Sequence, residues 1–270
     1  MTNKQTGELS FSCFYFIFIL TKQFIINFLS AQSITTLTLF GIKKGHWCWG
    51  LAQMGTMPPL LKQVKGLQFF KLLGSPKGGV FNIKPDFYLY GMFGVWESEA
   101  VADNFFKNSS IFYEYQQHCN ETWTIKLNPI KAHGLWDGVN PFQVTKATPH
   151  LTKPIAVLTR ASINVRAIPA FWKHGAATSK AIEQAEGLIA AVGLGELPFV
   201  RQATFSIWKT ENDIIQYAYK SAQHQQVIKK TRTDNWYSEE LFARFEVLGA
   251  TGSWKGKNPL ESYQEEASPV

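Results

Sequence analysis

The sequence predicts an α+β fold in which two βαββαβ units of one chain pack together as a single pseudo-symmetric barrel. Two observations predict it. The two halves of the 270-residue chain resemble each other, and strand-like and helix-like segments follow in the same order in each half. A third observation is the composition, 45% hydrophobic and 14% aromatic, which indicates a large packed core.

The internal repeat consists of three segment pairs in the same order along the chain. They are 62–74 with 183–195, 95–99 with 207–211, and 132–142 with 250–260. In the last pair, AHGLWDGVNPF and ATGSWKGKNPL share Ala, Gly, Trp, Gly, Asn and Pro at identical spacing. Ordered matches at nearly constant offset indicate a tandem duplication, in which each copy is one structural unit.

Each copy contains the same predicted elements. In the first copy, strands are expected at 34–42, 67–74, 86–96 and 122–130, and helices at 49–64 and 98–119. In the second, strands are expected at 155–163, 188–195, 202–208 and 241–249, and helices at 169–186 and 211–231. This order is that of the ferredoxin-like unit, and two such units can close into a dimeric α/β barrel. We expect an apolar ligand cavity inside it.

Predicted boundaries divide the chain into five parts. These are an N-terminal extension at 1–32, a first unit at 33–142, a linker at 143–154, a second unit at 155–260 and a tail at 261–270. The extension contains the apolar run 11–20, which is shorter than the ~20 residues of a spanning helix. A signal peptide fits the length, but only Lys4 precedes the run. We favour an upstream extension or a loose membrane anchor.

Two histidine motifs resemble those of secreted acid ribonucleases. His133 lies in AHGLWDG and His174 in FWKHG, and two histidines near a phosphodiester would supply an acid and a base. In the second copy, however, Thr251 takes the place of His133 while the surrounding Gly, Trp, Asn and Pro persist. The repeated part of the motif is therefore structural, with glycines for a turn and Trp for packing.

The charge and the cysteine content disfavour two further classes, nucleic-acid-binding proteins and proteins built on a disulfide framework. The net charge of +7 is spread along the chain without a long basic run, so no nucleic-acid partner is expected. Attraction to anionic lipid is the alternative to an unspecialised basic surface. Three cysteines, an odd and small number, provide no disulfide framework and indicate a reducing compartment.

Several long segments resemble one family. LTRASI at 158–163, GLGELPFVRQATFSIW at 193–208, WYSEELFARFEVLG at 236–249 and GSWKGKNPL at 252–260 strongly resemble the spheroidene monooxygenase family. LAQMG at 51–55 and FFKLLGS at 69–75 resemble the N-terminal half of the same family. The resemblance runs from about residue 33 to 260 and leaves the extension at 1–32 outside.

This resemblance implies a monooxygenase that introduces hydroxyl and keto groups at C-2 of an acyclic, spheroidene-type carotenoid. It implies O₂, haem iron, an electron donor such as reduced ferredoxin, and a cytoplasmic location, peripheral at the inner membrane. Related barrels include haem enzymes such as chlorite dismutases and dye-decolorising peroxidases. A non-catalytic haem- or lipid-binding barrel and a haem-degrading enzyme are the alternatives, because the same barrel can serve all three.

Haem needs an axial ligand, and the repeat singles out His224 among the six histidines. At an offset of 112, His224 aligns with Phe112, so an aromatic of the first copy becomes a histidine in the second. Tyr217 shares the predicted helix face of His224, and both are expected to bind the cofactor. A satisfied core histidine is the alternative. His46, in GHWCWG, and His174 are weaker candidates for the ligand.

Arg160 lies in LTRASI on a predicted central strand, where an unpaired cation would be costly. We expect it either to act in catalysis, by pairing a haem propionate or holding a bound oxygen species, or to form a salt bridge. The candidate partners of the salt bridge are Glu196, Glu239 and Glu240. The predicted core anchors of the repeat are Trp136, Trp208 and Trp254.

Overall fold

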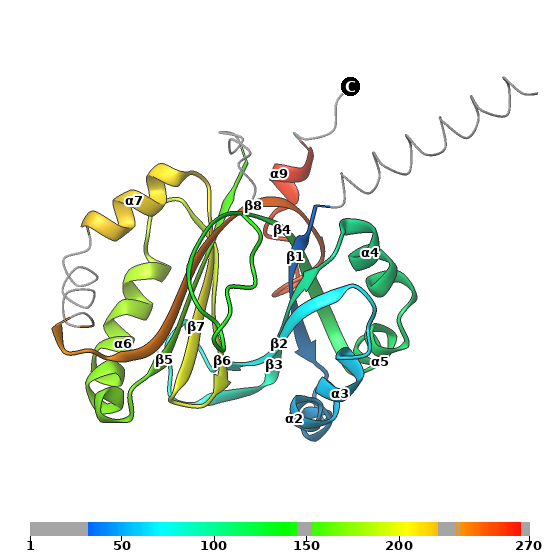
Figure 1. Cartoon of the computed structure of the whole chain (residues 1–270), viewed down its shortest axis with the longest axis horizontal. Helices are drawn as coiled ribbons and strands as arrows, with labels where there is room; N and C mark the ends of the chain where they lie inside the picture. Colours follow the sequence, from blue (N-terminus) through cyan, green and yellow to red (C-terminus); the bar gives the residue numbers. More distant parts are fainter. Residues whose placement is uncertain (1–31, 145–152, 221–230, 232, 266–270) are drawn as a thin grey trace, which may run out of the picture.

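The computed structural model describes residues 32–144, 153–220, 231 and 233–265, whose eight strands form a closed barrel (Figure 1). The strands of the first half are β1 Ile34–Ile42, β2 Leu67–Pro76, β3 Pro85–Trp96 and β4 Cys119–Gly134. Those of the second half are β5 Ile155–Ile163, β6 Leu188–Leu197, β7 Arg201–Trp208 and β8 Tyr237–Gly252. The order around the barrel is β1-β3-β2-β6-β7-β5-β8-β4. The predicted α+β barrel of two ferredoxin-like units is confirmed.

The two halves join at two seams of unequal length. β4 pairs antiparallel with β8 along most of its length, whereas β2 meets β6 at a single pair, Gly74 opposite Gly195. Within the halves the strand orders are β4-β1-β3-β2 and β8-β5-β7-β6, the order of a ferredoxin-like unit. The chain thus supplies both halves of a barrel, each from one copy of the repeat.

Alternate residues of each strand point into and out of the barrel. Core clusters form on both faces of the sheet, one inside the barrel and others outside it. One core cluster draws residues from all eight strands and therefore marks the interior. In β1, Leu37 and Leu39 belong to it, whereas Phe40 packs against the helices outside. In β5, Leu158 points inward and Val157 outward.

The barrel interior is a packed core. Four aromatic rings meet there with centroids 5.1 to 6.3 Å apart, those of Phe93, Trp136, Phe142 and Phe245. Trp136 and Phe142 belong to the segment after β4, which therefore enters the barrel. Among the described residues, these side chains take up part of the interior, where we expected an apolar ligand cavity.

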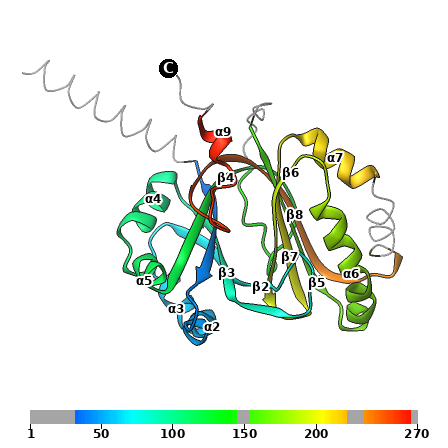
Figure 2. The ribbon, with the colours of Figure 1, turned by 180° about the vertical axis from the view of Figure 1, so that it is seen from behind.

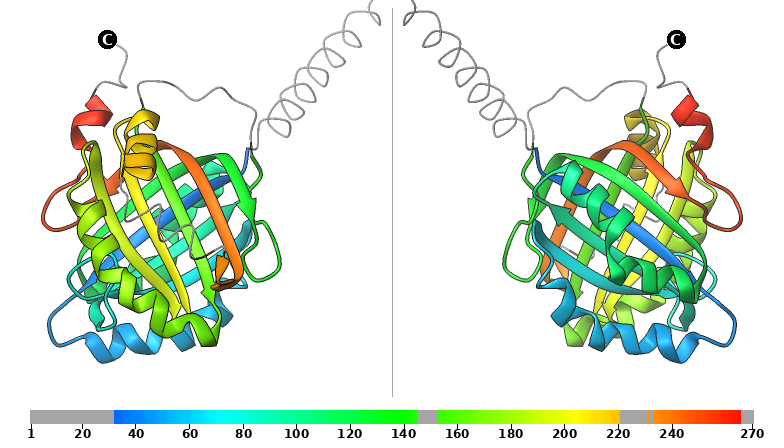
Figure 3. Two further views of the ribbon diagram at one scale, coloured as in Figure 1. Left: turned by 90° about the vertical axis from the view of Figure 1, so that its left-hand side faces the viewer. Right: turned by 90° about the vertical axis from the view of Figure 1, so that its right-hand side faces the viewer.

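Helices cover the outside of both halves (Figures 2 and 3). On the first half these are α2 Trp47–Thr56, α3 Pro58–Leu61, α4 Glu99–Asn108 and α5 Ser110–His118. The second half carries the 3-10 turn η1 Val165–Ala167 and the helices α6 Ile168–Glu183 and α7 Glu211–Lys220, and α9 Glu261–Glu265 follows β8. Within the described ranges, no helix has both the length and the apolar character needed to cross a bilayer.

Two predicted helices are each divided in two. The helix predicted at 98–119 is interrupted at Ser109, whose ψ of 129° is extended and whose hydroxyl accepts a hydrogen bond from the Ile111 amide. Ser109 therefore ends α4 and caps α5. The helix predicted at 49–64 divides before Pro58, because proline has no amide with which to continue the hydrogen bonding of α2.

Candidate functional site

Arg160, the predicted catalytic residue, points from β5 into the barrel. Its side chain is 1% exposed and lies over the Trp136 ring, 5.8 Å from the centroid. Arg160 Nε is 3.3 Å from Glu196 Oε1, and Arg160 Nη1 donates to Glu239 Oε1. The salt bridge expected for this arginine is present, with two of its three candidate partners.

The ion pairs extend from Arg160 into a larger group. Lys71 contacts Asp137 and lies 3.3 Å from Glu196 Oε2, and Arg201 Nη1 lies 3.1 Å from Asp137 Oδ1. We call the following side chains the Arg160 cluster: Lys71, Asp137, Arg160, Glu196, Arg201 and Glu239. Its cations and carboxylates balance, and exposure rises from 1% at Arg160 to 41% at Arg201. The guanidinium of Arg160 is therefore already neutralised by carboxylates and offers little charge to a ligand.

The turn after β4 holds two members of the cluster in place. The carboxylate of Glu239 accepts hydrogen bonds from the amides of Asp137 at 3.0 Å and Gly138 at 2.7 Å. Burial tends to raise the pKa of Glu239, but these amides and the Arg160 guanidinium hold it below its ordinary value. The pKa of Asp137 is likewise lowered, because Lys71, Arg201 and Arg160 outweigh the effect of burial.

Tyr217, a predicted cofactor-binding residue, lies on the other face of the same sheet. It belongs to α7 and packs against Trp208, with ring centroids 5.2 Å apart, in the cluster outside the barrel. Burial raises the pKa of the Tyr217 hydroxyl to about 12, so it is neutral at ordinary pH. Arg160 points inward and Tyr217 packs outside, so the structure does not bring these two predicted site residues together.

His224, the predicted haem ligand, lies outside the described residues. So does the part of the helix face around it, beyond the end of α7 at Lys220. At the described end of that face, Ile214 and Tyr217 pack against the sheet and Trp208. The expected haem ligation by His224 therefore stays a prediction. The described residues do not bring together a group of three His, Cys, Asp or Glu that could hold a metal ion.

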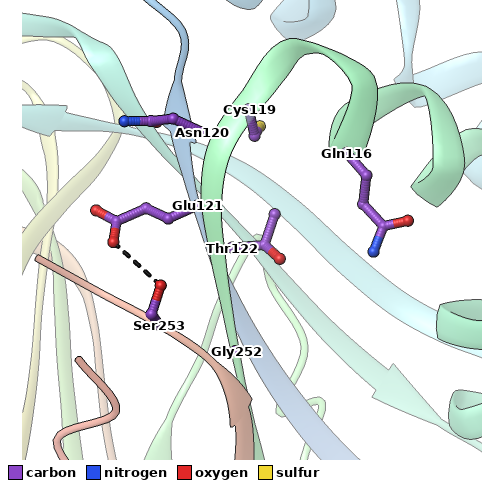
Figure 4. A pocket seen from close by; sticks show the side chains of 7 residues that line it. All are labelled: Gln116, Cys119, Asn120, Glu121, Thr122, Gly252 and Ser253. Carbon is purple, nitrogen blue, oxygen red and sulfur yellow. Dashed lines mark hydrogen bonds between the residues drawn. The ribbon is translucent and has the colours of Figure 1, made fainter. Parts of the chain in front are cut away.

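Two open hollows lie at equivalent places of the two halves. Figure 4 shows the first, about 420 Å³ in volume, at the start of β4. It is lined by Gln116, Cys119, Asn120, Glu121, Thr122, Gly252 and Ser253. The second, at the start of β8, is lined by Thr231, Asn235, Tyr237, Ser238, Glu239 and Glu240. The lining of the second hollow is predominantly polar and that of the first is about evenly polar and apolar, so neither is the mostly apolar pocket that suits a polyene.

The remaining predicted histidines have separate surroundings. His46 Nδ1 is 2.8 Å from His118 Nδ1, a hydrogen bond that joins the start of α2 to the end of α5. His133 is exposed on β4, opposite Phe242 of β8. The side chain of His174 lies outside the described residues. His46 thus has a structural partner, which the sequence did not indicate.

Two members of the Arg160 cluster, Lys71 and Asp137, were missed in the sequence. One signal could have found Asp137: its equivalent in the second copy of the repeat is Lys255, a reversal of charge inside an otherwise shared motif. For Lys71, on β2, the repeat offers a similar signal, because its equivalent in the second copy is the apolar Val192. The tryptophans predicted as core anchors are confirmed, with exposed fractions from 0% at Trp136 to 8% at Trp254.

Solved structures with the same fold include an aldoxime dehydratase. It aligns with a TM-score of 0.53 at 9% sequence identity, over 80% of this chain and 82% of that one. An aldoxime dehydratase in complex with butyraldoxime aligns with a TM-score of 0.52 at 7% identity. At such low identity these likenesses show the fold alone. No family model matches the chain.

Three curated relatives carry the name spheroidene monooxygenase. The protein of Rhodobacter capsulatus is 35% identical over 217 residues, 79% of this chain and 89% of that protein. That of Rubrivivax gelatinosus is 37% identical over 211 residues, 78% of this chain and 80% of the relative. That of Cereibacter sphaeroides is 35% identical over 213 residues, and the match spans 65% of its length. At this identity and coverage, the chain belongs to the spheroidene monooxygenase family.

Proposed function

We propose that this protein is a monooxygenase that oxidises C-2 of an acyclic, spheroidene-type carotenoid with O₂ and electrons from an external donor such as ferredoxin. The observation that carries the proposal is the family membership, at 35–37% identity over 211–217 residues. Each hydroxylation consumes one O₂, two electrons and two protons and releases one water. A second hydroxylation at the same carbon gives a geminal diol, which loses water to the ketone.

We place the reaction on the outer face of the second half, next to α7. Haem held by His224 would supply the activation of O₂ there. Aromatic side chains pack together in the barrel interior and neither hollow has a mostly apolar lining, so we place the polyene in neither. On the outer face, Trp208 and Tyr217 form an apolar wall that would exclude water from one side of the site.

Arg160 has no direct contact in this arrangement, because it points to the opposite face of the sheet. We assign it a positioning role: it ties Glu239, and through it the turn after β4, to β5. A carboxylate-bound guanidinium inside the barrel cannot also reach a propionate under α7. The proposal therefore depends on His224 and Tyr217 among the predicted site residues, and not on Arg160.

The experiment is expression in a bacterial host that accumulates spheroidene, with pigments separated and identified by mass. The expected product has gained one oxygen and lost two hydrogens, and growth under ¹⁸O₂ should label that oxygen. His224→Ala should abolish conversion and the Soret absorption of the purified, haem-supplied protein. His133→Ala, an exposed histidine on β4, is the matched control and should change neither.

Four outcomes would overturn parts of the proposal. Unchanged pigments with folded protein would contradict the substrate. Haem that binds without oxygen consumption under a reducing system would indicate a non-catalytic haem- or lipid-binding barrel. Loss of the haem itself, with release of iron, would indicate a haem-degrading enzyme. Soret absorption that survives His224→Ala would remove His224 as the ligand.

A further inference from the structure

The outward face of α2 is apolar and carries no charge. Trp47, Cys48 and Leu51 are exposed along it, and Leu60 of α3 is exposed next to its end. Exposed helix faces normally carry charged or polar side chains. In α2, however, the sequence WCWGLAQMGT contains no charged residue at all. Exposed fractions of 42% for Trp47 and 47% for Leu51 place large apolar side chains directly in water.

The same surface continues onto the start of β3. Phe87 is 41% exposed, and its ring centroid lies 5.9 Å from that of Trp47. We call Trp47, Cys48, Leu51, Leu60 and Phe87 the Trp47 face. α2 and α3 lie together at one end of the molecule, projecting from the barrel (Figure 1), so the face is presented outward.

Exposed lysines flank the two helices of this apolar face along the chain, and we call them the lysine rim. Residues 43–66 contain four lysines and no Asp or Glu. The lysines are Lys43, Lys44, Lys62 and Lys65, and all of them are exposed. An uncharged centre with tryptophan and leucine, flanked by lysines on both sides in the chain, is the pattern of segments that rest in the headgroup region of a bilayer.

The Trp47 face is also held rigidly. The His118 ring stacks on Trp49 of α2 with centroids 4.0 Å apart, and its Nδ1 is hydrogen bonded to His46. Lys43 Nζ donates to the Gln117 carbonyl at 2.6 Å. These contacts fix α2 against the end of α5, so docking need not order a loose segment and loses little conformational entropy.

We propose that the Trp47 face docks on the surface of an anionic lipid bilayer. Trp47, Leu51 and Phe87 enter the headgroup boundary, and the lysine rim pairs with lipid phosphates. Lipid is the occupant that fits both parts of the surface. The acyl chains of an anionic bilayer suit the apolar side chains, and its phosphates suit the lysines. The inference goes beyond the proposed reaction and stands without it.

A probe on Cys48 tests the docking locally. Cys48 is exposed, whereas Cys119 is buried and its thiol pKa is raised to about 12 by burial, so a thiol-reactive fluorophore selects Cys48 in a Cys13→Ser chain. Vesicles of phosphatidylcholine with phosphatidylglycerol should shift the probe emission to the blue, and vesicles of phosphatidylcholine alone should do so far less. A local probe is needed because the apolar run 11–20 could by itself bring the chain to vesicles.

Matched variants of the Cys48-labelled Cys13→Ser chain test the two parts of the surface, with the vesicle affinity taken from the probe shift. Leu51→Gln should weaken vesicle affinity on the order of tenfold, because one inserted apolar side chain is lost. Leu248→Gln, at 41% exposure on β8, is the matched control and should leave affinity unchanged. Lys44→Gln with Lys65→Gln should weaken binding to anionic vesicles, also on the order of tenfold, and reduce its salt dependence.

Four results would overturn the proposal. The first is a chain that sediments with vesicles while the Cys48 probe does not shift. The second is a probe already shielded without lipid, which would indicate that the N-terminal segment or a second copy covers the face. The third is equal affinity of Leu51→Gln and Leu248→Gln. The fourth is a probe shift caused by an acidic protein but not by anionic vesicles. Because no carotenoid is present, these results do not depend on the proposed reaction.

Discussion

Two turns related by the repeat, one after β4 and one after β8, have the same backbone and different surroundings. Asp137 and Lys255 adopt left-handed φ values of 53° and 57°, and the glycine after each has a φ of 80°. Each turn is held by a glutamate from the start of the other half's last strand, Glu239 for the first and Glu121 for the second. In both halves of the duplication, the turn therefore donates hydrogen bonds to a glutamate of the other half.

The surroundings differ because the side chains around each turn differ. The first turn carries Asp137 and belongs to the Arg160 cluster. At the second turn, Lys255 takes the place of Asp137, and Leu39 occupies the position equivalent to Arg160. The glycines and the glutamate carboxylates are thus common to both turns, whereas the charged side chains around the turns differ.

The largest effect is expected from removing the central cation. Arg160→Met should lower the free energy of unfolding by about 3 kcal/mol, because Glu196 and Glu239 lose a buried partner. Leu39→Met, the equivalent change in the other half, should cost about 1 kcal/mol or less, because it nearly conserves volume. Urea unfolding of both variants measures the difference. Equal losses would mean that the Arg160 cluster contributes no more than ordinary packing.

The shared backbone should respond equally at both turns. An alanine Cβ at Gly134 would lie 2.1 Å from the Glu240 carbonyl oxygen, and one at Gly252 would lie 2.0 Å from that of Thr122. Both glycines have positive φ, so Gly134→Ala and Gly252→Ala should each cost about 2–3 kcal/mol. Gly138→Ala, at positive φ but with open space around it, should cost about 1 kcal/mol. Clearly unequal costs at 134 and 252 would contradict the equivalence of the two turns.

The fold could be predicted largely from the sequence because the strands have strong local signals. The predicted strands at 34–42 and 155–163 coincide with β1 and β5, in which β-branched and apolar residues alternate. The repeat then supplied the order of the elements. What local pattern could not supply is the face on which each residue lies, since strands buried on both sides are apolar throughout.

The same limit explains why the candidate site was only partly predicted. Arg160 and Tyr217 were expected near one cofactor, but the parity of β5 turns Arg160 inward while α7 covers the outer face. Lys71 meets Asp137 because barrel closure brings β2 next to the turn after β4, a contact across 66 residues that no local motif encodes. Of the three glutamates named as candidate partners of Arg160, Glu196 and Glu239 contact it.

A smaller difference is expected between the two supporting glutamates. Glu239→Gln loses an acceptor for one turn amide and the charge facing Arg160, and should cost about 1–2 kcal/mol. Glu121→Gln loses an acceptor in the second turn, where Lys255 and Gly256 donate at 3.0 Å, and should cost about 1 kcal/mol. Thermal unfolding of the two variants at neutral pH measures this. A larger loss at Glu121 would show that the Arg160 cluster adds nothing to the shared turn.

The smallest effect is a dependence of the Glu239 contribution on pH. The pKa values of Asp137 and Glu239 are lowered in the folded protein, by Lys71, Arg201 and Arg160 at Asp137 and by amides and Arg160 at Glu239. A lowered carboxyl pKa stabilises the fold above the ordinary pKa, and this stability is lost as pH falls through the folded value. The stability difference between the unmodified chain and Glu239→Gln should therefore be constant near neutrality and shrink below pH about 4. Urea unfolding across this range provides the measurement, and a difference that persists unchanged into acid would show that Glu239 acts through its geometry and not through its charge.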